Sequence, residues 1–112
     1  MTDTELKKQV EKALASYPSL PQPTIKITSL SIVMTLTGEH AAVANVGPLV
    51  DALQRKEINY LDPTPGTNDV SILVDNDQRG TPRKVVVSVD RMNKEEYNKA
   101  LDVMAKAQAN NN

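Results

Sequence analysis

The 112-residue sequence predicts an α+β fold, in which one sheet carries helices mainly on one face. Three observations point to this class. Apolar residues near both ends recur at helical spacing, β-branched residues in the middle alternate with period two, and turn-forming residues separate these segments. A chain of this length is the usual size of one domain, so we expect a single compact domain, residues 1–112, with one core.

The first predicted element is an amphipathic helix within residues 1–17. Thr2 or Thr4 can cap it, and its apolar positions share one face opposite several lysines: Leu6, Val10, Ala13, Leu14 and Tyr17. We expect this stripe to pack on the core rather than to form a detachable arm. Three prolines in residues 18–23 end the helix and predict an extended linker before the α/β core, residues 24–109.

Residues 24–37 predict a β-strand whose apolar face changes phase. Ile25 and Ile27 are odd-numbered, whereas the apolar residues that follow are even-numbered: Leu30, Ile32, Met34 and Leu36. Since side chains alternate with period two, a phase change requires an interruption. The sequence therefore predicts a bulge or break near Thr28 and Ser29.

Residues 38–56 have helical spacing that Gly47 and Pro48 interrupt. Proline lacks an amide hydrogen and collides with the preceding turn of a helix. Two interpretations stay open: a continuous but kinked helix, or a short turn followed by a helix with Pro48 at its first position.

A β-hairpin is predicted after the loop at residues 62–68. Its two strands have alternating valine and isoleucine residues, and Asp75 to Arg83 between them contains the turn formers Asn76, Asp77, Gly80 and Pro82. Leu73 and Val86 add apolar character to the second face, which predicts that both strands are interior.

The last helix is predicted to begin at Asn93, with Glu96 completing a capping box. Its expected buried stripe is Tyr97, Ala100, Leu101 and Met104, and residues 110–112 form a frayed tail. The resulting order, α-β-α-β-β-α, resembles the ferredoxin-like arrangement without its last strand and with a helix added in front. Such a topology implies no particular function.

Composition excludes several classes of site. The chain has no cysteine, which excludes disulfides, iron–sulfur clusters and cysteine-bound zinc. Its formal net charge of −1 gives no global attraction to nucleic acid or to an anionic membrane. No apolar run approaches the ~20 residues needed to span a bilayer, and the amino terminus is acidic rather than basic. We therefore expect a cytoplasmic protein without membrane contact.

Candidate catalytic residues are sparse. His40 is the only histidine, and it could pair with Glu39 or Asp51, but neither a nucleophile motif nor a phosphate-binding glycine loop accompanies it. Four loop carboxylates match no calcium-loop spacing and are interpreted as solvated turn acids: Asp62, Asp69, Asp75 and Asp77. The sequence thus predicts no catalytic residue, no metal site and no cofactor.

One segment concentrates positive charge. Residues 78–94 contain one acid, Asp90, and five basic residues that form a weak candidate binding surface: Arg79, Arg83, Lys84, Arg91 and Lys94. Long cationic side chains at a hairpin tip can reach a phosphate backbone or an acidic protein. The segment contains no aromatic residue, which disfavours the usual recognition of single strands.

Three functional hypotheses follow. The favoured one is a small non-catalytic binding or regulatory module that acts through protein–protein contact or self-association. The alternative is a nucleic-acid-binding module that uses the basic hairpin, whose affinity would fall steeply with salt. The third is an enzyme centred on His40.

Overall fold

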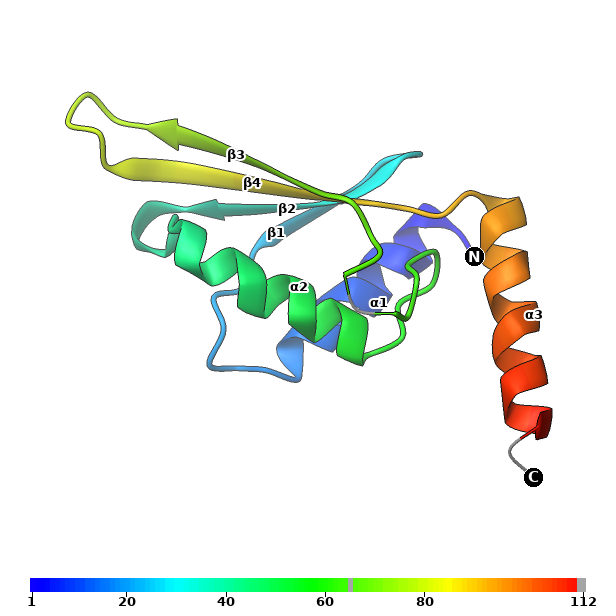
Figure 1. The fold of residues 1–112 in the computed structure, drawn as a ribbon. Helices are drawn as coiled ribbons and strands as arrows, with labels where there is room; N and C mark the ends of the chain where they lie inside the picture. Colours follow the sequence, from blue (N-terminus) through cyan, green and yellow to red (C-terminus); the bar gives the residue numbers. More distant parts are fainter. Residues whose placement is uncertain (65, 111–112) are drawn as a thin grey trace.

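The computed structural model describes residues 1–64 and 66–110, which fold in the order α-β-β-α-β-β-α (Figure 1). The elements before the midpoint are α1 (Asp3–Ala15), β1 (Thr24–Ile27) and β2 (Ser31–Thr37). Two single turns of 3-10 helix, η1 (Gly38–His40) and η2 (Val43–Asn45), lead into α2 (Val46–Arg55), β3 (Val70–Asn76), β4 (Pro82–Asp90) and α3 (Lys94–Asn110). The molecule is elongated, with extents of 56 × 27 × 23 Å.

The four strands form one antiparallel sheet in the order β1-β2-β4-β3. Strands β2 and β3 run parallel with β4 between them, so β2, α2 and β3 make a split β-α-β unit. If α3 is left out and the elements are taken in the order β2, α2, β3, β4, α1, β1, they follow the pattern β-α-β-β-α-β. The sheet is therefore a circular permutation of the ferredoxin-like arrangement. The α+β class is as predicted, but the predicted element order is wrong. The strand expected to be missing is β1, and the helix expected as an addition, α1, is the second helix of the layer.

The predicted break at Thr28 and Ser29 is confirmed, and it is a full chain reversal. Ile27 pairs with Ile32 across the β1–β2 hairpin, and the Thr28 hydroxyl accepts the Ser31 amide at 2.9 Å. Antiparallel partners share a face, and in this hairpin each odd-numbered residue lies opposite an even-numbered one. The phase change is therefore the mark of the hairpin. Leu30 was wrongly assigned to the apolar face, since it lies at the turn and is 75% exposed.

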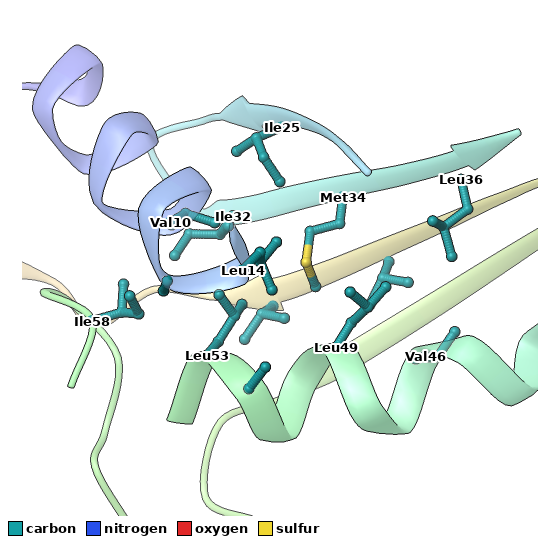
Figure 2. Packing of buried hydrophobic residues seen from close by; sticks show 14 of the residues in the cluster. Val10, Leu14, Ile25, Ile32, Met34, Leu36, Val46, Leu49, Leu53 and Ile58 are labelled. Carbon is teal, nitrogen blue, oxygen red and sulfur yellow. The ribbon is translucent and has the colours of Figure 1, made fainter. Parts of the chain in front are cut away.

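The core lies between the sheet and the helix pair α1 and α2 (Figure 2). Helix α1 belongs to this core, as predicted, and Thr2 and Glu5 form its capping box. The core is aliphatic; its largest side chains, all less than 2% exposed, are Leu6, Leu14, Ile32, Met34, Leu36, Leu49, Leu53, Val10, Val85, Val87 and Val89.

The linker after α1 is not simply extended. Residues 18–20 form a turn, and the Leu20 amide donates to the Tyr17 carbonyl at 2.9 Å. The Gln22 side-chain amide donates to the Leu14 carbonyl at 3.2 Å and to the Leu20 carbonyl at 3.1 Å. The Gln22 side chain thus ties the turn to the last turn of α1, which keeps the chain folded back here.

Helix α2 follows the second interpretation of residues 38–56, because turns precede a separate helix. Pro48 is its third residue rather than its first. The first four amides of a helix have no acceptor within it, so a proline at this position removes no helical hydrogen bond.

The predicted hairpin is present as β3 and β4, but only β4 is interior, and β3 forms an edge of the sheet. The prediction that both strands are interior is therefore wrong. The apolar Leu73 gives β3 the sequence pattern of a strand buried on both faces, but the Leu73 side chain is 70% exposed.

Helix α3 begins as predicted, with the Glu96 amide donating to the Asn93 side chain at 2.8 Å. Tyr97, Ala100 and Met104 are half-buried, but Leu101 is exposed, and none of the described residues of α3 joins the core. The predicted stripe is wrong to that extent, because α1 and α2 already occupy the helix-bearing face of the sheet (Figure 1). Of the predicted tail, residues 111 and 112 lie outside the described residues. In the part of the chain that is described, no helix has the length and apolar character to cross a membrane.

Candidate functional site

The β3 edge, defined here as Val70 to Val74, presents apolar side chains on both faces of the sheet. Val70 and Ile72 lie opposite the buried Val89 and Val87, so they point to the helix-bearing side, yet they are 39% and 46% exposed. Leu73 points to the other side. Apolar groups on both faces of one strand are typical of a strand that is covered on both sides.

The backbone of this edge also has free hydrogen-bonding groups. The Asp90 amide donates to the Asp69 carbonyl at 2.9 Å, which places these two residues in a hydrogen-bonded pair of the β3–β4 ladder. Because such pairs alternate along antiparallel strands, residues 71 and 73 direct their backbone groups towards β4. Val70, Ile72 and Val74 therefore direct their amides and carbonyls outwards.

The opposite edge, β1, is protected in ways that β3 is not. Strand β1 has four residues, follows Pro21 and Pro23, and carries Lys26 at its centre. Short length, proline and lysine are the features by which edge strands avoid pairing with other chains. Strand β3 has seven residues and contains neither proline nor lysine. The two edges thus differ in their capacity to accept another strand.

The helices leave the β3 edge uncovered. Helix α1 lies against β1 and α2, while the β3–β4 hairpin extends beyond α2 (Figure 1). Val74 packs against the core from this strand, but Val70 and Ile72 lie at the margin of the helix layer.

The five basic residues do not form one surface. Arg79, Arg83 and Lys84 lie at the hairpin tip, whereas Arg91 and Lys94 follow the far end of β4. Arg83 and Arg91 are eight residues apart along an extended strand, or about 27 Å. The structure therefore separates the predicted surface into two groups.

Acidic side chains largely neutralise the tip. The Arg83 guanidinium contacts the Asp75 carboxylate at 3.1 Å, and Lys84 is the cross-strand partner of the same residue. The Asp77 carboxylate accepts hydrogen bonds from the backbone amides of Arg79 and Thr81. Three cations face two carboxylates, which leaves one net positive charge at the tip.

Arg91 is a structural residue whose role the sequence did not indicate. Its side chain is only 12% exposed, and its Nη1 donates to the Thr28 carbonyl at 2.6 Å and to Asp3 at 3.4 Å. Its guanidinium carbon lies 4.8 Å from the centre of the Tyr60 ring. Local sequence patterns could not predict these contacts, because Asp3, Thr28 and Tyr60 are all distant from Arg91 in the sequence.

A groove of about 680 Å³ lies between the 62–69 loop and α3. Its charged lining is mixed: Asp62, Asp69, Asp90, Glu96, Arg91 and Lys99. Asp62 accepts the Thr64 amide at 2.9 Å, as a turn acid does. Among the described residues, no group of three or more histidine or carboxylate side chains could hold a metal ion.

His40 is an exposed residue of η1. Its side chain is 57% exposed, and its Nε2 lies 3.7 Å from the carboxylate of the adjacent Glu39. Asp51 lies on the exposed surface of α2. In the part of the chain that the structure describes, the only acidic contact of His40 is thus with an exposed carboxylate, and contacts of this kind are weak in water.

The β3 edge, the hairpin tip and the groove are the surfaces from which a function can be inferred. Comparison of the chain with protein-family models, with curated proteins and with solved structures gives no significant match.

Proposed function

We propose that the chain is a small non-catalytic module that binds protein through the β3 edge. The observation that supports this proposal is the long, proline-free and lysine-free edge strand, with its outward backbone groups and exposed apolar side chains. Its mode of binding is β-strand addition, in which backbone hydrogen bonds supply affinity and alternate side chains supply specificity. Such a module has a regulatory or accessory role in the cytoplasm. Disulfides are rare in that compartment, and the chain has no cysteine to form one.

Both faces of the sheet favour this mode. An added strand would place side chains beside Val70 and Ile72 on the helix-bearing side and beside Leu73 on the other. Side chains directly opposite each other on antiparallel strands have Cβ atoms about 4.5–5.5 Å apart, which is close enough for apolar groups to pack. The exposed side chains would thereby gain contacts that the monomer does not provide.

The other two hypotheses have less support. A nucleic-acid interface would rest on the hairpin tip, whose cations are mostly matched by acids. An enzyme would rest on His40, whose neighbouring carboxylate belongs to the exposed Glu39.

The proposal is tested by placing a photoreactive amino acid at position 72 of the full chain in its own cells. The matched control carries the same group at position 26, an exposed residue at the centre of the protected edge. We expect covalent protein adducts from position 72 and few from position 26, and mass spectrometry identifies the adduct. Equal or weaker labelling from position 72 would contradict the proposal.

A further inference from the structure

We infer that the protein bound by the β3 edge is a second copy of this chain, joined by antiparallel pairing of β3 with β3 about a twofold axis at Leu73. This inference rests on the proposed function and names its partner. The pairing would join two four-stranded sheets into one continuous sheet.

The alternation of side chains restricts where the axis can lie. Residues opposite each other in an antiparallel sheet share a face, so an even-numbered residue of β3 must face an even-numbered residue of the second copy. This condition is met only when the twofold axis passes through a residue rather than between two residues. The candidate centres in the exposed part of the strand are therefore Ser71, Ile72, Leu73 and Val74.

Charge and the pairing of apolar side chains together favour one centre among these four. An axis at Ile72 sets Asp69 opposite Asp75 of the second copy, and this like-charge contact occurs twice. An axis at Val74 sets Leu73 against Asp75, and an axis at Ser71 sets Leu73 against Asp69. An axis at Leu73 instead sets Ser71 opposite Asp75, so that a hydroxyl can donate to a carboxylate. It also brings Asp69 level with Asp77 of the second copy, but Asp77 lies in the turn after β3, where its carboxylate accepts hydrogen bonds from two backbone amides.

The Leu73 register pairs exposed apolar side chains on both faces of the sheet and also uses the outward backbone groups of the edge. Ile72 meets Val74 of the second copy on the helix-bearing side, and this pair also occurs twice. Both residues direct their backbone groups outwards, so the two pairs supply four hydrogen bonds. The two Leu73 side chains meet on the other face, where each is now 70% exposed.

The same register leaves the contacts of Asp75 and Asp77 in place. Asp75 retains its contact with Arg83 at 3.1 Å. Asp77, which lies beyond the bulge at Asp75 and Asn76, keeps the amides of Arg79 and Thr81. Ile72, Leu73 and Val74 thus meet apolar side chains, Val70 lies opposite Asn76, and the carboxylates of Asp75 and Asp77 keep their partners.

The absence of cysteine from the sequence gives a direct test of this register. Full-length variants Leu73→Cys, Ile72→Cys and Ser71→Cys are oxidised under identical mild conditions. Opposed residues in a non-hydrogen-bonded pair have Cα atoms about 4.5 Å apart, which suits a disulfide. In the Leu73 register the two Ser71 residues are four positions apart, about 13 Å, and cannot be linked.

We expect Leu73→Cys to form a linked dimer at least about tenfold faster than either other variant, because only its sulfur atoms face each other. The cysteine-free parent should sediment as a reversible dimer, and Ile72→Lys should weaken that dimer at least about tenfold, because two lysines would enter the contact. Fastest linkage of Ile72→Cys or Ser71→Cys would overturn the register, and a parent that stays monomeric at all concentrations would overturn self-pairing.

Failure of this inference is distinguishable from failure of the proposed function. A monomeric parent that still gives adducts with another protein at position 72 would refute self-pairing and leave the β3 edge as a protein-binding surface. A monomeric parent without such adducts would refute both.

Discussion

The guanidinium carbon of Arg91 lies 4.8 Å from the centre of the Tyr60 ring, and that ring lies 4.7 Å from the ring of Tyr97. Arg91 also bonds to Thr28 in the β1–β2 turn and to Asp3 at the start of α1. One side chain therefore connects four segments that are far apart in the sequence. It stabilises the end of the molecule where α3 joins the sheet.

We predict that Arg91→Met lowers the free energy of unfolding by about 2–3 kcal/mol, because a charge-assisted hydrogen bond and a cation–π contact are lost from a mostly buried site. The Nε atom of Arg91 is buried and has no hydrogen-bond partner among residues 1–64 and 66–110, which limits the net contribution of this side chain. Arg91→Lys should have an intermediate effect, since lysine can donate to the Thr28 carbonyl but cannot stack as a plane. Urea unfolding measures the free energy of unfolding of the parent and of the two variants.

The matched control for Arg91 is Lys94→Met. Lys94 is exposed at the start of α3, so its loss should change stability by less than about 0.5 kcal/mol. Equal effects of the two substitutions would show that charge alone, rather than the contacts of Arg91, accounts for the loss.

We predict that Leu14→Ala lowers the free energy of unfolding by about 2–4 kcal/mol, because truncation of a buried leucine leaves a cavity. Leu14 is 1% exposed between α1 and the sheet (Figure 2). The control is Leu101→Ala on α3, where the side chain is 45% exposed and should contribute less than about 1 kcal/mol. Denaturant midpoints at one protein concentration make the comparison, and a Leu14 effect below that of Leu101 would refute a core role for α1.

The sequence was sufficient to predict the α+β class, the core stripe of α1, the β3–β4 hairpin and the Asn93 cap. Each depends on residues near one another in the chain, through periodicity, turn chemistry or capping. The β1–β2 hairpin was missed because its turn contains Ser29 and Leu30 rather than a glycine or asparagine signal. The phase change was visible, but period-two patterning alone does not separate a bulge from a reversal.

The site was less predictable than the fold. An open edge depends on which strands end up adjacent, and local pattern does not specify that β4 lies between β2 and β3. Leu73 gave the strand an interior pattern, although its exposure is what makes the edge a candidate surface. The clustering of basic residues in sequence was equally misleading, since an extended strand separates Arg83 from Arg91 by about 27 Å.

Two glycines provide a paired test of backbone conformation. Gly47 is the second residue of α2 and has open space where the methyl group of an alanine would lie, whereas Gly80 has φ +81° at the hairpin tip. We predict that Gly47→Ala changes the free energy of unfolding by less than about 0.5 kcal/mol, because the higher helix propensity of alanine is offset by the clash of its Cβ with the ring of Pro48. Gly80→Ala should lower it by about 1–2 kcal/mol, because the left-handed region is strained for alanine. A smaller loss of stability from Gly47→Ala than from Gly80→Ala in thermal unfolding is the expected result, and an equal or larger loss from Gly47→Ala would contradict the assigned backbone.

The last prediction concerns the hairpin tip and separates protein binding from the nucleic-acid alternative. The triple substitution of Arg79, Arg83 and Lys84 by serine should leave the melting temperature nearly unchanged, because exposed ion pairs contribute little to folding. Self-association should also stay within about threefold of the parent, since these cations add mainly long-range steering rather than the contacts of the β3 edge. Sedimentation measures the association, and binding of a DNA duplex and an RNA duplex is measured in parallel over a range of salt concentrations. If the parent binds either duplex and the triple variant does not, with the salt slope falling by about one unit for each lost phosphate contact, the tip is a nucleic-acid interface and the alternative function is favoured.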